Sequence, residues 1–106
     1  MKEITPREFV EKRAGGAEVT LLDVREGWEL ERAPVPSEIV HIPMGKIADR
    51  LRELDPEREI VVICRSGGRS TEVARFLERN GFKNVANLTG GILKWSADLD
   101  PSIPRY

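Results

Sequence analysis

Short apolar runs alternate with longer mixed segments along the chain. Apolar residues dominate 19–24, 59–63 and 84–88, and each run is short enough to be one buried strand. The segment 38–42, which is followed by Pro43, predicts a further strand. The run at 59–63, "EIVVI", is the strongest of these signals.

Helix signals lie between the predicted strands. Thr5, Pro6 and Glu8 form a capping box with proline in the first turn, and the helix that they begin is expected to end at Gly15–Gly16. Apolar residues at helical spacing predict three more helices. These are expected over 44–54, from about residue 70 to a stop at Gly81, and over 90–99. The segment 25–38 is expected to be irregular.

This alternation predicts the fold class. Strands separated by helices, with few tight hairpin signals, indicate an α/β fold whose central sheet is mainly parallel and covered by helices on both faces. The length of 106 residues suits one domain, which we place at 1–106. Such sheets bind ligands at the carboxyl ends of their strands, and Cys64 directly follows the strand at 59–63. The sequence therefore predicts a site at Cys64.

Composition narrows the partners and the compartment. The formal charge is −1 and both signs are interspersed, which argues against nucleic acid or an anionic membrane as the main partner. No apolar run approaches the length of a membrane span or a signal peptide, so we expect a cytoplasmic protein. A single cysteine suits a reducing cytoplasm. Because Cys64 and His41 are the only thiol and imidazole, we expect no metal and no cofactor.

The segment 64–70, "CRSGGRS", carries the chemistry. Arg65 and Arg69 bring positive charge, while Gly67 and Gly68 permit backbone angles that let several N–H groups converge on one point. The next helix adds the positive end of its dipole, and together these features are expected to stabilise a thiolate. A lone cysteine after an apolar strand is often only a small core residue. A core residue does not require flanking glycines and arginines, so we favour a reactive thiol.

The candidate site follows from this segment. We expect Cys64 to be the catalytic nucleophile, and the substrate-binding residues to be Arg65, Ser66, Gly67, Gly68, Arg69 and Ser70. Asp23 and Arg25 end the first apolar strand on the same sheet edge, where they either orient the loop or substrate or simply brace a loop.

The motifs resemble those of a single-domain rhodanese, over essentially the whole chain. The stretches that carry the resemblance are "LLDVRE" followed by Trp28-Glu29, "HIPM", "VVICRSGGRS", "NGF" and "NLTGGILKW". The ending "DPSIPRY" is similar to rhodanese domains attached to activating enzymes of molybdopterin and thiamin biosynthesis. One departure stands out: "RAPVPSEIVHIPM" replaces the family's usual Gly-His-Ile-Pro-Gly-Ala segment. The resemblance therefore does not cover the loop expected to control substrate entry.

The resemblance implies a three-layer rhodanese-like fold and sulfurtransferase activity. Cys64 would take a sulfane sulfur from thiosulfate or a persulfide donor and hold it as a cysteine persulfide. A thiol, cyanide or a sulfur-carrier protein would then accept that sulfur, since the chain has no second cysteine. Two arginines in the loop mildly favour a dianionic donor such as thiosulfate, and Arg69 is the preferred anion-binding residue.

Other residues that are common in functional sites are expected to have structural roles here. His41 lies in a predicted strand, and a thiolate mechanism needs no base, so we expect it to be structural. Trp28 and Trp95 are expected to be packing residues, with a position in the wall of the pocket as the alternative for either. Gly90–Gly91 is expected to allow a tight turn into the last helix, with a place at the border of the site as the weaker alternative.

Two other functions stay open. A cysteine phosphatase or arsenate reductase would use a Cys-x5-Arg loop, whereas four residues separate Cys64 from Arg69 here. A non-catalytic rhodanese-like binding module would not need the thiol or the loop around it.

Overall fold

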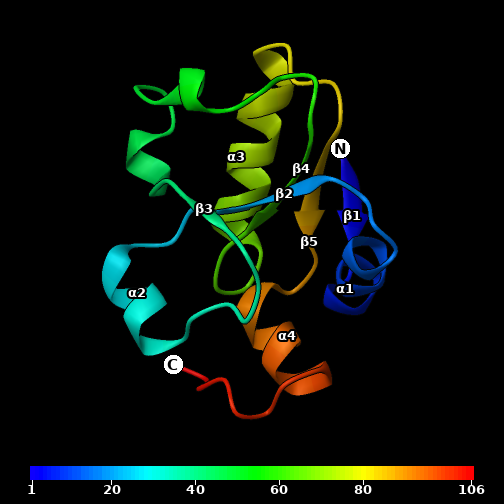
Figure 1. Cartoon of the computed structure of the whole chain (residues 1–106). Coiled ribbons are helices and arrows are strands. Elements are labelled where there is room, and N and C mark those ends of the chain that lie inside the picture. Colours follow the sequence, from blue (N-terminus) through cyan, green and yellow to red (C-terminus); the bar gives the residue numbers. More distant parts are fainter.

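The computed structural model describes residues 1–106, and its centre is a parallel five-stranded sheet in the order β1-β5-β4-β2-β3 (Figure 1). The strands are β1 (Lys2–Ile4), β2 (Val19–Asp23), β3 (Val40–His41), β4 (Glu59–Ile63) and β5 (Val85–Leu88). Every neighbouring pair is parallel. The predicted α/β class with a mainly parallel sheet is confirmed.

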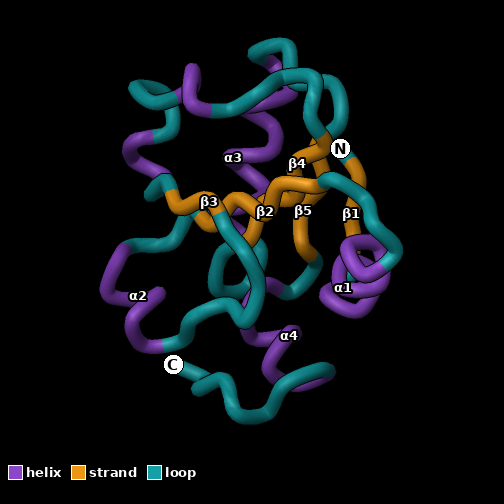
Figure 2. Tube along the Cα trace, in the orientation of Figure 1, coloured by secondary structure: helices purple, strands orange, loops and turns teal.

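Helices cover both faces of this sheet. They are α1 (Pro6–Ala14), α2 (Gly27–Arg32), α3 (Gly68–Arg79) and α4 (Gly91–Asp98). Figures 1 and 2 show α3 on one side of the sheet, with α1 and α4 on the other. The three-layer arrangement expected from the resemblance is therefore present.

Alternating side chains of the strands build a separate core on each face. Leu22 and Val62 point into a cluster shared with α3, whereas Leu21 and Val61 point into a cluster shared with α1 and α4. All four side chains are fully buried. Burial of each such side chain stabilises the fold by roughly 1.5–3 kcal/mol. This two-sided burial explains why the strands are continuous apolar runs.

Local capping fixes α1 as the sequence predicts. The Thr5 hydroxyl accepts from the Glu8 N–H, and the Glu8 carboxylate accepts from the Thr5 N–H. The helix ends at Ala14, and Gly81 with φ of 88° follows the end of α3. None of the helices combines the length and apolar character needed to cross a bilayer.

The predicted helix over 44–54 is wrong. The segment forms two 3₁₀ turns, Met44–Lys46 and Leu51–Glu53, and Arg50 leaves helical geometry with φ of −113° and ψ of 18°. Ile47 and Leu54 are buried in the cluster under α3, as their spacing suggested. The apolar pattern therefore predicts burial correctly, but two short turns satisfy it as well as one helix does.

The structure adds two elements that the sequence did not reveal. β1 is a three-residue edge strand paired with β5, and α2 occupies part of the segment expected to be irregular. Both are too short to show a periodic pattern. The strand predicted over 38–42 shrinks to the two residues of β3. Ala33, which follows α2, is buried in the cluster shared with α1 and α4, so the chain from α2 to β3 runs on that face of the sheet (Figure 1).

Candidate active site

Cys64 lies between the carboxyl end of β4 and the start of α3. Gly67 is the N-cap of α3, with φ of 114°, a backbone angle that side chains with Cβ rarely adopt. Its N–H donates to Cys64 Sγ over 3.1 Å. The glycine thus turns the loop back so that a main-chain donor faces the sulfur. The sequence led us to expect several such donors, and Gly67 is the one that contacts the sulfur.

A polar network extends from the sulfur into the sheet. The Ser70 hydroxyl lies 3.3 Å from Cys64 Sγ and donates to Asn87 Oδ1. The Asn87 amide in turn donates to the Glu3 carboxylate over 3.1 Å. Because the one proton of Ser70 is directed at Asn87, the hydroxyl presents its oxygen to the sulfur, and Gly67 supplies the donor.

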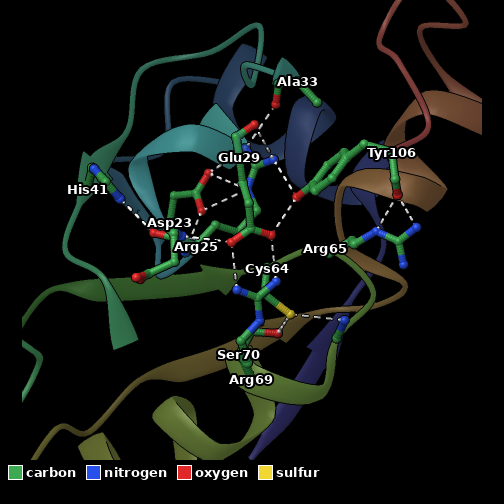
Figure 3. Close-up of polar contacts among 12 residues, drawn as sticks. Asp23, Arg25, Glu29, Ala33, His41, Cys64, Arg65, Arg69, Ser70 and Tyr106 are labelled. Atoms are coloured by element: carbon green, nitrogen blue, oxygen red, sulfur yellow. Dashed lines mark hydrogen bonds and ion pairs between the residues drawn. The ribbon is translucent and has the colours of Figure 1, made fainter. Parts of the chain in front are cut away.

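Arg69 is held by a carboxylate from α2. Its Nη1 and Nη2 atoms donate to Glu29 Oε2 and Oε1 over 2.7 and 2.8 Å (Figure 3). These bonds lower the pKa of Glu29 to about 2, although burial works in the opposite direction. The same bonds raise the pKa of Arg69. The pair is therefore fully ionised at neutral pH.

Asp23 and Arg25 form a buried ion pair behind this contact. Arg25 Nη2 donates to Asp23 Oδ2 over 2.8 Å, and both side chains are inaccessible to solvent. Arg25 also donates to the carbonyl of Ala33, at the end of α2. Burial disfavours its charge, but hydrogen bonds to Asp23 and Tyr106 raise the pKa of Arg25 above its ordinary value. Asp23 and Arg25 thus brace the segment that carries Glu29.

Tyr106 joins the end of the chain to both ion pairs. Its hydroxyl accepts from Arg25 Nη1 over 3.0 Å and donates to Glu29 Oε1 over 2.9 Å. Arg65 donates to the Tyr106 carbonyl, and its guanidinium lies 5.2 Å from the centre of the tyrosine ring. Burial raises the pKa of Tyr106, which keeps its hydroxyl in the donor form.

The predicted site residues are brought together, with unequal exposure. Cys64 is only 1 % exposed and Ser70 is fully buried. Ser66 and Gly68 face solvent, while Arg65 and Arg69 are half-buried. Cys64 is free, and its burial means that a ligand reaches the sulfur only if neighbouring groups move.

The residues that were expected to have structural roles differ in their burial and contacts. His41 Nε2 lies 2.7 Å from the Arg25 carbonyl, consistent with a structural role. Trp95 is buried among core residues, as expected. The packing role expected for Trp28 is wrong: it is 62 % exposed, with its ring edge-on to Tyr106 at 6.0 Å between centroids.

Gly90 and Gly91 both have positive φ, and the tight turn predicted there is confirmed. The second glycine also lies directly against the loop. A Cβ on Gly91 would lie 2.5 Å from the carbonyl oxygens of both Cys64 and Arg65. The first turn of α4 therefore packs directly against the main chain of the cysteine loop.

Four residues of the network were given no individual role from the sequence: Glu3, Glu29, Asn87 and Tyr106. Glu29, Asn87 and Tyr106 entered only as letters of family motifs. Glu29, Asn87 and Tyr106 contact Arg69, Ser70 and Arg65 across large sequence separations, so no local pattern could pair them with the loop. No shared sequence signal marks them, since Glu29 lies within α2, Asn87 lies within β5 and Tyr106 lies beyond α4.

A groove on the surface lies away from Cys64. This groove of about 440 Å³ separates α3 from the turn at 44–48 and is lined by residues including Met44, Val73 and Phe76. Cys64 does not line this groove.

Comparisons with known proteins identify the family. The family described as "Rhodanese-like domain" matches residues 5–98. YtwF of Bacillus subtilis, named as a candidate sulfurtransferase, is 41% identical over 101 residues, covering 95% of this chain and 96% of that protein. A protein of Allochromatium vinosum named sulfurtransferase is 32% identical, covering 91% of this chain and 89% of its own.

Similarity extends to a larger protein and to a solved structure. MoeZ of Mycobacterium tuberculosis, whose name combines adenylyltransferase and sulfurtransferase, is 31% identical over 97% of this chain, which spans only 26% of MoeZ. The likeness to the rhodanese domain of such activating enzymes is thereby confirmed. The crystal structure of a rhodanese-like domain protein from Staphylococcus aureus matches with a TM-score of 0.83 and 33% identity, covering 90% of this chain and 91% of that one.

Proposed function

The chain belongs to the rhodanese-like family, and from this membership we propose that it is a sulfurtransferase that carries sulfur as a persulfide on Cys64. The observation that supports this most directly is the contact between the Gly67 N–H and Cys64 Sγ. A main-chain donor at 3.1 Å stabilises negative charge on sulfur, both in the thiolate and in the persulfide anion.

The transfer balances as a displacement at sulfur. The Cys64 thiolate attacks the outer sulfur of thiosulfate, the S–S bond to the sulfonate group breaks, and sulfite leaves with the bonding electron pair. Cys64 then carries an S–S⁻ group with the same charge that the thiolate had. A persulfide donor reacts in the same way and releases a thiolate. No cofactor or metal takes part in either step.

The second half of the cycle requires an external acceptor. Cys64 is the only cysteine, so no resolving thiol within the chain can remove the sulfur. The acceptor is a thiol or a sulfur-carrier protein in the cell, or cyanide in an assay. We place this chemistry in the cytoplasm, where a reducing environment keeps the thiol free.

Sulfur transfer at Cys64 requires a conformational change that opens access to the sulfur. With Cys64 1 % exposed, a donor must displace a neighbouring side chain to make contact. The groups drawn around the sulfur in Figure 3, including Arg69, belong to the start of α3 and are held by α2 and Tyr106. The same burial is what a non-catalytic binding module would show, so this function is the alternative that the experiment must address.

Intact-mass measurement tests the proposal. The chain is incubated with thiosulfate or with a small-thiol persulfide and then desalted. We expect the added mass of one sulfur atom, its loss on addition of cyanide, and no addition in Cys64→Ser. An unchanged mass with every donor would leave the non-catalytic module as the better assignment. Hydrolysis of para-nitrophenyl phosphate faster than sulfur transfer would instead support a phosphatase.

A further inference from the structure

Both arginines of the cysteine loop already have partners within the chain. Arg69 makes two parallel hydrogen bonds to the Glu29 carboxylate, at 2.7 and 2.8 Å. Arg65 donates to the carbonyl of Tyr106. The excess positive charge that favoured a dianionic donor in the sequence is therefore reduced, because one of the two guanidinium charges is neutralised by a carboxylate.

Glu29 is held firmly in this position. Besides Arg69, its carboxylate accepts from the Glu26 N–H over 2.8 Å and from the Tyr106 hydroxyl over 2.9 Å. Its side chain is only 4 % exposed, compared with 35 % for Arg69. A carboxylate with four donors around it does not swing away readily, so its negative charge is a fixed part of the site.

The Glu29 carboxylate lies close to the route by which an anionic donor would approach the sulfur. In Figure 3 the Arg69 guanidinium is drawn between the Glu29 carboxylate and Cys64 Sγ. Arg69 also interacts electrostatically with Cys64. A donor that binds Arg69 while it approaches the sulfur must share the guanidinium with Glu29. The repulsion that it meets from Glu29 increases with each negative charge that it carries.

We propose that Glu29 is a specificity-determining residue that discriminates against dianionic sulfur donors such as thiosulfate and favours donors with at most one negative charge, a class that includes persulfides of uncharged thiols. The inference rests on the proposed sulfurtransferase function and names its donor class. For a persulfide R–S–SH, the Cys64 thiolate attacks the outer sulfur, R–S⁻ leaves with the bonding pair, and Cys64–S–SH remains.

Two donors that differ mainly in charge provide the test. Thiosulfate carries two negative charges, and methanethiosulfonate presents the same type of sulfane sulfur with one. Its transfer gives methanesulfinate in place of sulfite, so both reactions balance in the same way. We expect the wild-type chain to use methanethiosulfonate with a kcat/KM about tenfold above that for thiosulfate, the effect of one partly screened charge.

Substitution of Glu29 separates its charge from its shape. In Glu29→Gln we expect the preference to fall to about twofold or less, through an approximately tenfold lower KM for thiosulfate with little change in kcat. Glu29→Asp retains the charge and should keep a preference close to the wild-type value. Glu53→Gln removes the same charge from an exposed pair with Arg50 and serves as the matched control, with no change expected.

The outcomes separate this inference from the proposed function. If the wild-type chain forms no persulfide on Cys64 with either donor, the sulfurtransferase function itself fails. If persulfide forms but the wild type prefers thiosulfate, the inference about Glu29 is overturned, even where Glu29→Gln does not fold. The inference is also overturned if Glu29→Gln weakens both donors equally, since Glu29 would then only brace Arg69. If Glu29→Asp loses the preference for methanethiosulfonate as fully as Glu29→Gln does, the negative charge of Glu29 is not its cause.

Discussion

Gly91 lies in contact with the main chain of Cys64, since a Cβ at this glycine would stand 2.5 Å from the cysteine carbonyl oxygen. The Ile92 N–H donates to the same carbonyl over 3.0 Å. The first turn of α4 therefore holds the residue before the loop by a hydrogen bond and by close packing. This contact ties the position of the thiol to a helix that is distant in sequence.

Gly91→Ala tests that contact. The added methyl group meets two carbonyl oxygens that cannot rotate away, and φ at this position is +58°. We expect a loss of unfolding free energy of about 2–4 kcal/mol, from steric overlap and backbone strain together. Urea denaturation followed by circular dichroism measures this loss.

Gly16→Ala is the control for Gly91→Ala. Its φ of +92° imposes a comparable backbone strain, but nothing lies within 4 Å of the added Cβ. We expect this substitution to cost only about 1–2 kcal/mol. Equal losses for the two variants would show that close packing against Cys64 contributes nothing.

Gly67→Ala and Gly68→Ala form a matched pair within the cysteine loop. Gly67 needs φ of +114°, whereas Gly68 has no positive φ and no neighbour within 4 Å of an added Cβ. Gly67→Ala is expected to cost about 1–3 kcal/mol and to slow persulfide formation, because the N–H that faces the sulfur is displaced. Gly68→Ala should stay within about 0.5 kcal/mol of the wild type in thermal and urea unfolding. Equal stability of the two variants would contradict the assignment of the turn to Gly67.

Arg25→Met probes the buried ion pair. Removal of the guanidinium leaves the Asp23 carboxylate without its partner in a site closed to solvent. We expect a loss of about 3–5 kcal/mol in urea unfolding experiments. The double variant Asp23→Asn, Arg25→Met should recover part of this loss, because no unpaired charge remains. No recovery would mean that hydrogen bonds of Arg25 to Ala33 and Tyr106, not the charge pair, supply the stability.

The Glu29–Arg69 pair predicts how stability responds to acid. The pKa of Glu29 is about 2 in the folded chain, compared with an ordinary value of 4.5. Its contribution to stability is therefore complete above pH 4.5 and is lost as the pH falls from there toward about 2. Urea unfolding at pH 2 to 6 should show this loss in the wild type.

Glu29→Gln should flatten the acid dependence, because the titrating carboxyl is gone. Glu53→Gln is again the comparison: its carboxylate pairs with Arg50 at an exposed position, where solvent screens the interaction. We expect that variant to retain most of the wild-type slope. An unchanged slope in Glu29→Gln would place the acid sensitivity at other carboxyl groups.

The elements that were predicted correctly are those whose sequence signals lie within a few neighbouring residues. A run such as 59–63 is apolar on both faces because helices cover both sides of the sheet, so its burial is visible in composition alone. The capping box at Thr5 and Glu8 closes within one turn. The predicted helix over 44–54 failed for a related reason, since apolar spacing reports which residues are buried and two 3₁₀ turns bury them equally well.

Local signals in this chain were enough to establish a parallel α/β fold and a glycine-rich turn after Cys64, because periodicity, capping and turn chemistry act over a few residues. The partners of the arginines lay beyond such signals. Glu29 reaches Arg69 across 40 positions and Tyr106 reaches Glu29 across 77, so only folding of the chain brings these charges together. The charge that a donor meets at the sulfur depends on those distant contacts, and so does the burial of the thiol.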